Sequence, residues 1–167
     1  VAALRAADLG KEVMLIDERD QPGGVCLIEG CIPSKALINA VETANAAREA
    51  KKFGLSFSEL KIDTKALAEF TSGVVDSLTK GIEGLLKRRG VELVHGRARF
   101  ESNKSLFLEN SEVAAVDFKQ AVIATGSRPN MLPGMEDIGL WTSADALKVK
   151  EIPEKLVVVG GGYIGME

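Results

Sequence analysis

The sequence has 167 residues, of which 46% are hydrophobic and 27% charged, and its net charge is −3. This length and balance predict a soluble globular protein with a core of ordinary size. The small negative charge gives no electrostatic reason to bind nucleic acid or an anionic membrane, and the longest apolar runs are too short to cross a bilayer.

The first half of the chain is predicted to consist of long helices around one short strand. The expected elements are a helix over residues 1–9, a buried strand over 12–17, and helices over 33–52 and 63–89. Gly10, Gly54 and Gly90 follow the three helices, where glycine favours a helix end. The last helix carries one apolar stripe, formed by Leu67, Phe70, Val74, Leu78, Ile82, Leu85 and Leu86.

The second half is predicted to consist mainly of strands. The expected strands cover residues 91–94, 97–100, 105–108, 112–116, 120–125 and 155–159. Two of them, 105–108 and 112–116, form a small antiparallel excursion. The continuous apolar strands that alternate with helices predict an α/β fold with a parallel sheet. The proline-containing stretch 129–153 is the best candidate for a linker.

Both ends of the sequence fall inside predicted elements. A helix is already under way at Val1, and the final residues, 160–167, form a glycine-rich turn. The natural protein is therefore expected to extend beyond this sequence.

Cys26 and Cys31 are the only cysteines, and four residues separate them. In a regular helix five residues rise about 7.5 Å, whereas Cα atoms joined by a disulfide lie roughly 4.4–6.8 Å apart. The thiols can therefore bond only in a loop or a distorted first turn, which Gly30 and Pro33 favour. Cys31 would then begin a helix, whose dipole favours a thiolate, and Lys35 adds positive charge one turn later. This pattern is typical of a redox-active dithiol, and two buried free cysteines are the alternative.

Other cysteine and histidine chemistry has less support. A structural zinc site usually needs four ligands, and the only histidine, His95, lies far from the cysteines in sequence. A secreted disulfide scaffold needs more than two cysteines. We therefore expect no metal site, and a reducing, cytosol-like environment.

A glycine-rich turn follows the last predicted strand. Gly160, Gly162 and Gly165 form a G-x-G-x-x-G pattern directly after KLVVV, an arrangement that brings a dinucleotide pyrophosphate to the start of a helix. A glycine-rich turn without a ligand is the alternative. Asp17 ends the strand over 12–17, where an acid of a dinucleotide-binding fold accepts hydrogen bonds from a ribose, although a solvated acid fits there too.

The sequence GGVCLIEGCIPSKAL, over residues 23–37, resembles the redox-active motif GG(T/V)CLNVGCIPSKALL of the dihydrolipoamide dehydrogenase family, within the class I pyridine nucleotide-disulfide oxidoreductases. Ile28 and Glu29 depart from the usual Asn and Val, which keeps the cysteine spacing and alters the surroundings of the disulfide. Glutathione and mercuric reductases share the cysteine pattern, but the first usually lacks the Ser-Lys-Ala-Leu run. The match is therefore closest to the dihydrolipoamide dehydrogenases.

The resemblance extends over nearly the whole chain. ATGSRP, over 124–129, resembles the family's segment beside FAD, and GRARF, over 96–100, resembles its G-x-G-x-F strand. GGGYIGME, over 160–167, resembles the start of its NAD-binding domain, and Asp17 replaces its usual ribose-binding Glu. The cofactor-binding residues that the resemblance implies are Asp17, Gly23, Gly24, Lys35, Gly96, Ala98, Thr125, Gly126, Ser127, Gly160, Gly162 and Gly165.

The resemblance also implies catalytic roles. Cys26 would be the interchange thiol that exchanges with dihydrolipoamide, Cys31 the thiol nearest the flavin in a charge-transfer state, and Lys35 would lie near flavin N5. The family's catalytic base is a His paired with a Glu near the C-terminus of a partner subunit, and neither residue is in this sequence. His95 is expected to be a structural or surface residue instead.

The implied activity is the oxidation of dihydrolipoamide by NAD⁺ through a Cys26–Cys31 disulfide and FAD. Residues 1–150 would form most of a Rossmann-like FAD-binding domain, and residues 151–167 would begin an NAD-binding domain. The implied partners are dihydrolipoamide on a lipoyl domain, a second subunit in a homodimer, and a 2-oxoacid dehydrogenase or glycine-cleavage complex.

We expect no nucleic acid or membrane partner, and a location in the cytoplasm, or in the mitochondrial matrix of a eukaryote. Two alternatives stay open. One is another disulfide reductase of the same family, similar to glutathione or mercuric reductase. The other is that this chain by itself is a non-catalytic fragment or an interaction module.

Overall fold

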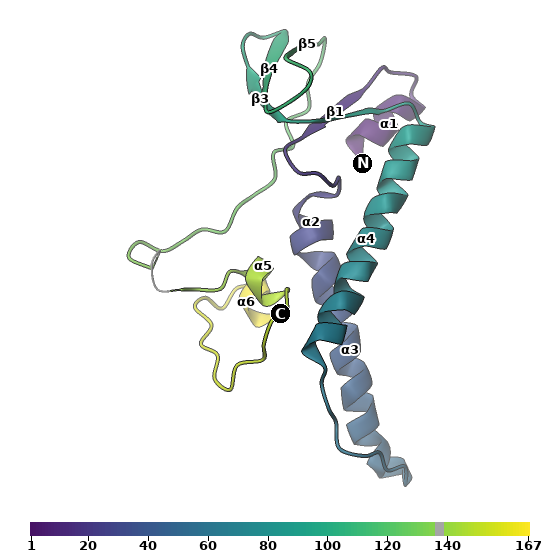
Figure 1. The fold of residues 1–167 in the computed structure, drawn as a ribbon, viewed down its shortest axis with the longest axis vertical. Coiled ribbons are helices and arrows are strands. Elements are labelled where there is room, and N and C mark those ends of the chain that lie inside the picture. Colours follow the sequence, from purple (N-terminus) through teal and green to yellow (C-terminus); the bar gives the residue numbers. More distant parts are fainter. Residues whose placement is uncertain (136–138) are drawn as a thin grey trace. The chain divides into compact units, whose positions relative to one another are not determined.

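The computed structural model describes residues 1–135 and 139–167 (Figure 1). The chain forms two compact units: unit 1 comprises Val1–Gly23 and Leu78–Gly126, and unit 2 comprises Gly24–Ser77 and Ser127–Glu167. The long helix α4, Thr64–Arg88, contributes residues to both units.

Unit 1 holds the described strands. Its elements in chain order are α1 (Ala2–Asp8), β1 (Met14–Asp17), the last part of α4, β2 (Glu92–His95), β3 (Arg97–Phe100), β4 (Ser105–Glu109) and β5 (Ala115–Asp117). β1 and β2 pair in parallel, with Asp17 opposite His95. Both residues therefore lie at the carboxyl ends of neighbouring parallel strands, the end at which α/β sheets bind ligands.

The small antiparallel sheet of unit 1 has the order β3–β4–β5 (Figure 1). Arg99 on β3 forms an ion pair of 2.9 Å with Glu109 on β4. The rings of Phe100 and Phe118 meet edge to face, with centroids 5.9 Å apart. The predicted α/β class, a parallel sheet with an antiparallel excursion, is thus confirmed.

Gly96 joins the two sheets of unit 1. Its N–H donates to the carbonyl of Asp17 at 2.9 Å. A Cβ at this position would lie 2.7 Å from Cβ of Ser111, and φ is 150°, so that only glycine fits without a shift of the backbone. The buried hydrophobic residues of unit 1 are Leu86, Val91, Val94 and Leu108.

Unit 2 consists of helices and extended chain. Its elements are α2 (Gly24–Glu29), α3 (Cys31–Glu49), the 3₁₀ turn η1 (Ala50–Phe53), the first part of α4, α5 (Ser143–Ala146) and α6 (Tyr163–Met166). The predicted end at Gly54 is confirmed, because φ there is 81°. The predicted start of α4 is confirmed as well: Asp63 Oδ1 accepts a hydrogen bond from the N–H of Ala66 at 3.0 Å.

Two predicted strands do not form. Residues 120–125 and 155–159 form neither strand nor helix, and the side chains of Val122 and Val157 are 78% and 86% exposed. An apolar strand becomes stable when neighbouring strands take up its backbone hydrogen bonds, and no described strand does so here.

The apolar stripe predicted for α4 is also partly wrong. Phe70 and Leu78 are 49% and 45% exposed, whereas the adjacent face, with Thr71, Val75 and Thr79, is buried. The hydroxyl of Thr71 donates to the carbonyl of Leu67 at 2.9 Å, and this bond allows a threonine to face the interior. The face of α4 that is buried therefore depends on the elements packed against it, and not on the hydrophobicity of its side chains alone.

The predicted linker, 129–153, includes residues 136–138, which lie outside the described residues. Its described part contains α5. The predicted domain boundary near residue 150 stays a prediction.

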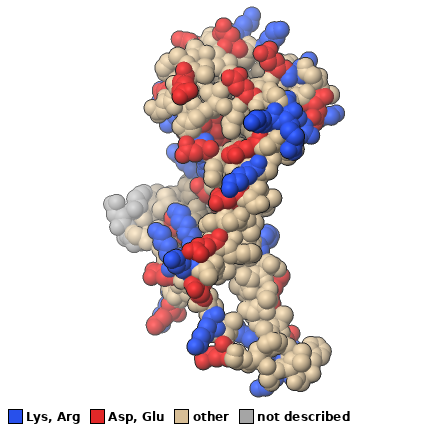
Figure 2. All heavy atoms as spheres, turned by 45° about the vertical axis from the view of Figure 1, so that its right-hand side comes forward, with Lys and Arg blue, Asp and Glu red and all other residues tan. Residues whose placement is uncertain are grey.

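One stretch, Gly24–Phe53, is long and apolar enough to cross a membrane by length and composition. This is weak evidence, because core helices of soluble proteins pass the same test. The stretch is also interrupted at Gly30, between α2 and α3. On the face seen in Figure 2, acidic and basic side chains are interspersed.

Candidate functional site

The two cysteines lie at the junction of two helices in unit 2. Cys26 is in the middle of α2, a helix that was not predicted, and Cys31 is the first residue of α3, at the helix start predicted for it. Both helices are labelled in Figure 1. Both are exposed thiols, and a contact between them raises the pKa of Cys26. Their disulfide stays a prediction, but the break between α2 and α3 supplies the distorted turn that the bond requires.

Gly30 lets the chain fold back on Cys26. A Cβ on Gly30 would lie 3.0 Å from the carbonyl oxygen of Val25 and 3.4 Å from Cα of Cys26. The backbone of the residue before Cys31 is therefore packed against the backbone around Cys26. A larger residue at position 30 would push the two thiols apart.

Lys35, one turn into α3, is held by the last residue of the chain. Its ammonium group pairs with Glu167 Oε1, and the hydroxyl of Ser34 donates to the same oxygen at 2.5 Å. Lys35 and, second, Ser34 lower the pKa of Glu167. The cysteine motif and the glycine-rich motif thus share a charged contact within unit 2.

Glu167 is the functional candidate that sequence reasoning missed. Glu167 ends the motif GGGYIGME. An acidic residue directly after a glycine-rich turn was the feature of the sequence that could have drawn attention to it. Its partner lies more than a hundred residues earlier, so that no local pattern connects the two.

In the glycine-rich motif over residues 160–165, each glycine is explained by a different feature of the structure. Gly160 has a φ of 108°, which makes the tight turn. Gly162 caps α6 and has open space where a Cβ would stand. A Cβ on Gly165 would lie 2.3 Å from the carbonyl oxygen of Gly160, so that close packing demands glycine. These are the three roles of the dinucleotide fingerprint.

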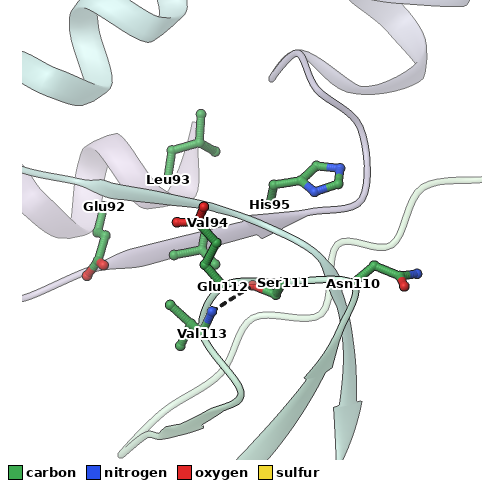
Figure 3. Close-up of a pocket in the computed structure, with 8 residues that line it drawn as sticks. All are labelled: Glu92, Leu93, Val94, His95, Asn110, Ser111, Glu112 and Val113. Atoms are coloured by element: carbon green, nitrogen blue, oxygen red, sulfur yellow. Dashed lines mark hydrogen bonds between the residues drawn. The ribbon is translucent and has the colours of Figure 1, made fainter.

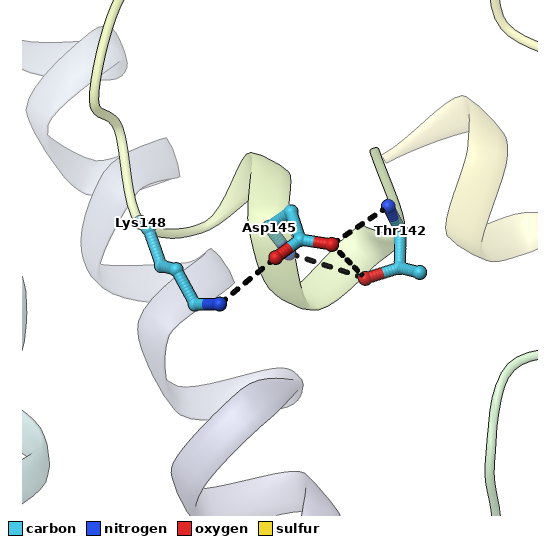
Figure 4. A network of polar contacts seen from close by, with 3 residues as sticks. All are labelled: Thr142, Asp145 and Lys148. Atoms are coloured by element: carbon cyan, nitrogen blue, oxygen red, sulfur yellow. Dashed lines mark hydrogen bonds and ion pairs between the residues drawn. The ribbon is translucent and has the colours of Figure 1, made fainter. Parts of the chain in front are cut away.

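A polar network anchors the short helix α5 (Figure 4). Thr142 and Asp145 form a capping box: the N–H of Asp145 donates to Thr142 Oγ1 at 3.3 Å, and the N–H of Thr142 donates to Asp145 Oδ2 at 3.1 Å. Lys148 pairs with Asp145 Oδ1 at 2.8 Å. Lys148 first, and Thr142 second, hold the pKa of Asp145 well below its usual range.

In unit 1, three predicted cofactor residues lie near the ends of strands. The carboxylate of Asp17 accepts the N–H of Arg19 at 3.0 Å, which orients it beyond β1. Gly96 lies directly after β2, and Ala98 is exposed on β3 opposite Leu108. The other predicted cofactor residues lie where the chain passes from one unit to the other, namely Gly23, Gly24, Thr125, Gly126 and Ser127.

The positive φ of 155° at Gly23, 69° at Gly24 and 74° at Gly126 explains glycine at these crossing points. Thr125 and Ser127 are exposed beside Gly126. Their role in cofactor binding stays a prediction.

A pocket of about 340 Å³ lies elsewhere in unit 1, between β2 and the turn after β4 (Figure 3). His95 lines it beside Asn110 and Ser111. The side chain of His95 is 52% exposed, and Nε2 lies 3.0 Å from the carbonyl of Glu18. His95 is therefore a surface residue, and no predicted cofactor or catalytic residue lines this pocket.

A paired-cysteine junction and a dinucleotide-type glycine turn on an α/β chain define a class of protein, the nucleotide-dependent disulfide oxidoreductases. Comparison with known proteins agrees. Residues 1–167 match the pyridine nucleotide-disulphide oxidoreductase family, and the chain belongs to that family.

Several similar curated proteins are dihydrolipoyl dehydrogenases. The chain is 46% identical over 173 residues to dihydrolipoyl dehydrogenase 2 of Haloarcula marismortui and 45% identical over 169 residues to dihydrolipoyl dehydrogenase of Bacillus subtilis, and both matches cover 100% of the chain. It is 41% identical to the Buchnera aphidicola enzyme of the same name, over 99% of the chain. The chain spans 36% of the length of each of these relatives.

Proposed function

We propose that this chain is part of a dihydrolipoyl dehydrogenase, which oxidises dihydrolipoamide with NAD⁺ through Cys26, Cys31 and FAD. The observation that carries the proposal is the α2–α3 junction, where Gly30 brings two exposed thiols into contact. A protein with this junction can store two electrons as a dithiol and release them by forming a disulfide. The names of the curated relatives supply the substrate.

The residues present fit the two cofactors. Gly160 and Gly162 leave open space at the start of α6, where a pyrophosphate would lie, and Gly165 allows the close packing of the turn, which favours NAD here. Asp17 at the carboxyl end of β1 suits a ribose of FAD, with Gly96, Ala98 and the 125–127 segment as further candidate contacts. When bound, FAD and NAD⁺ supply the two-electron chemistry that amino acid side chains lack.

The cysteines perform the exchange with the substrate. A substrate thiolate attacks Sγ of Cys26, the Cys26–Cys31 bond breaks, and Cys31 leaves as a thiolate. The second substrate thiol then attacks the substrate sulfur of the mixed disulfide, which releases Cys26 and closes the substrate disulfide. The substrate loses two electrons and the protein gains them. Cys31 at the start of α3 is suited to hold the negative charge.

The remaining features of the proposal concern the whole protein. Residues up to about 150 belong to a FAD-binding domain, and the rest begins an NAD-binding domain. The protein acts as a homodimer on lipoyl domains of a 2-oxoacid dehydrogenase or glycine-cleavage complex. Its location is the cytoplasm, or the mitochondrial matrix in a eukaryote, because two cysteines are too few for a secreted disulfide scaffold.

The test is turnover by protein expressed from its complete coding sequence. NADH formation should follow addition of dihydrolipoamide and should be lost in Cys26→Ser and Cys31→Ser, while both variants keep bound flavin. Glutathione disulfide and mercuric ion, tested with NADPH as the reductant, are the competing substrates. Faster turnover with either of them would replace the proposed substrate, and no turnover with any would reject the activity.

A further inference from the structure

The chain makes a turn, residues 18–20, directly after β1 in unit 1. Asp17, the last residue of β1, stands opposite His95, the last residue of β2, in the parallel pair. Parallel sheets bind ligands beyond the carboxyl ends of their strands. The contacts that hold this turn therefore decide how Asp17 is presented to a ligand.

One carboxylate oxygen of Asp17 holds the turn, and the other is available. Oδ1 accepts a hydrogen bond from the N–H of Arg19 at 3.0 Å, which fixes the orientation of the side chain. Oδ2 takes part in no hydrogen bond or ion pair that the described residues form. Asp17 is half-buried. A carboxylate in this state is suited to accept a hydroxyl group of a ligand through Oδ2.

His95 holds the same turn from the end of β2. Its ring atom Nε2 lies 3.0 Å from the carbonyl oxygen of Glu18, and Figure 3 shows the ring beside the chain that leaves β1. Because a carbonyl oxygen can only accept, Nε2 carries the proton and donates it. The N–H of the next residue, Gly96, donates to the carbonyl of Asp17 at 2.9 Å. Two consecutive residues at the end of β2 therefore bind two consecutive carbonyl groups where the turn begins.

The charged contacts of the turn contribute less than this hydrogen bond. His95 Nε2 lies 3.5 Å from Asp20 Oδ1, and Arg97 Nε lies 3.9 Å from Glu18 Oε2. The side chains of Asp20 and Glu18 are 98% and 66% exposed. Ion pairs between exposed groups add little to stability, because water and salt screen them. The bond from His95 to the backbone is thus the contact through which this side chain fixes the turn.

We propose that His95 is a positioning residue for FAD, which holds the turn after β1 so that Asp17 is ready to bind the adenosine ribose. This inference rests on the proposed function, because it takes FAD as the cofactor and Asp17 as its ribose ligand. A turn that is already ordered loses less conformational entropy when a ligand binds. Loss of the His95 hydrogen bond therefore weakens FAD binding through Asp17.

The experiment measures how fast FAD leaves the complete, flavin-bound protein. The protein is diluted strongly, and the rise in fluorescence of the released flavin gives the rate. In His95→Phe, which removes the donor, release should be about fivefold faster, as expected for the loss of one hydrogen bond. In His95→Gln release should stay near the wild-type rate, because the side-chain amide can donate to the carbonyl of Glu18. Glu92→Gln is the matched control: Glu92 lies at the other end of β2 and lines the same pocket as His95, so its loss should change nothing.

A second background separates positioning from a merely structural role. Asp17→Asn keeps an oxygen that can accept the N–H of Arg19 and replaces the charged Oδ2 by an amide group. FAD release should therefore be faster in Asp17→Asn. If His95 acts through Asp17, adding His95→Phe to Asp17→Asn should speed release less than about twofold, because the effects of coupled residues do not add.

Three results would overturn the inference and leave the proposed function intact. They are release from His95→Phe at the wild-type rate, equally fast release from His95→Phe and His95→Gln, and the full effect of His95→Phe in the Asp17→Asn background. A complete protein that binds no FAD would overturn both the inference and the proposed function.

Discussion

At the scale of single residues, the candidate site depends on glycines that nothing larger can replace. Gly30 packs against the backbone around Cys26, and Gly165 packs against the carbonyl of Gly160. Neither requirement comes from a positive φ, which favours glycine elsewhere in the chain. Both come from close approach of two backbone segments. Each glycine can therefore be tested by adding a single methyl group.

Gly165→Ala is expected to open the glycine-rich turn, because the new Cβ would lie 2.3 Å from the carbonyl oxygen of Gly160. Binding of NADH, followed by quenching of the flavin or by NADH fluorescence, should weaken at least tenfold. Gly161→Ala is the matched control, since nothing lies within 4 Å of a Cβ there. Equal binding by the two variants would show that the turn does not hold the dinucleotide.

Gly30→Ala is expected to slow formation of the Cys26–Cys31 disulfide. The added methyl group would press on the carbonyl of Val25 at 3.0 Å and widen the junction. Oxidation by a glutathione disulfide pulse, read by mass spectrometry of trapped thiols, measures the rate. Gly73→Ala is the control: it lies in open space on α4 and should instead stabilise that helix by about 0.5–1 kcal/mol. Unchanged oxidation in Gly30→Ala would contradict the geometry of the junction.

At the scale of elements, α5 shows how a four-residue helix can stay formed. Its length is far below what an isolated helix needs. The capping box of Thr142 and Asp145 satisfies the free backbone groups at its start, and Lys148 binds the same carboxylate. The network therefore also fixes the position of the Lys148 ammonium group beside α5.

The capping box predicts how the stability of α5 depends on pH. The folded-state pKa of Asp145 is lowered, chiefly by Lys148 and then by Thr142, so its stabilisation of α5 is complete at neutral pH. That stabilisation is lost as the pH falls below the ordinary carboxyl range. Asp145→Asn should reduce amide protection of Ala146 at pH 7, and the difference from the wild type should disappear in acid. Protection that is the same in both proteins at pH 7 would argue against the network.

Thr142→Ala removes the other half of the box. The loss of an N-cap costs about 1 kcal/mol, so the hydrogen-exchange protection of the α5 amides should fall about fivefold. Ser143→Ala, which changes a hydroxyl one residue away that takes no part in the box, is the control. A similar loss in both variants would mean that the cap is not what holds α5.

Local sequence patterns predicted most helices and strands. They failed where contacts with other parts of the chain determine the structure. The ends at Gly10, Gly54 and Gly90 were predictable because glycine adopts positive φ there. Residues 120–125 and 155–159 have the composition of strands, yet a strand also needs neighbours that composition cannot supply. The buried face of α4 carries Thr71 and Thr79, which a search for apolar stripes passes over.

At the scale of the whole molecule, the main feature is an apolar segment, residues 156–159, whose side chains are exposed. Val157 and Val159, before the glycine-rich turn, are 86% and 59% exposed in a run that has the pattern of a buried strand. The curated relatives are longer, since the chain spans 36% of their length. We expect further strands of the complete protein to pair with this segment.

Hydrogen exchange tests that expectation. In the 167-residue polypeptide the amides of residues 157–159 should exchange at nearly the rate of unfolded chain. In the complete protein they should be protected at least a hundredfold, because parallel neighbours would take up their hydrogen bonds. Fast exchange in both proteins would show that the segment is not a strand of the NAD-binding domain.

The residues of the candidate site could be predicted where they belong to one contiguous sequence motif. Cys26, Cys31 and Lys35 stand in one segment, and so do Gly160, Gly162 and Gly165. Glu167 was missed because its contact with Lys35 depends on the fold of unit 2. Motifs thus identify the chemistry, and tertiary contacts set the charges around it.

The most direct test of the central claim is an anaerobic titration of the complete protein with dihydrolipoamide, followed by visible absorption. We predict a flavin spectrum that gains a long-wavelength band once two electrons have entered, and that Cys31→Ser removes this band. A protein expressed in full that binds no flavin, or whose flavin responds in the same way without Cys31, would contradict the assignment of this chain to a flavin-dependent dithiol–disulfide oxidoreductase.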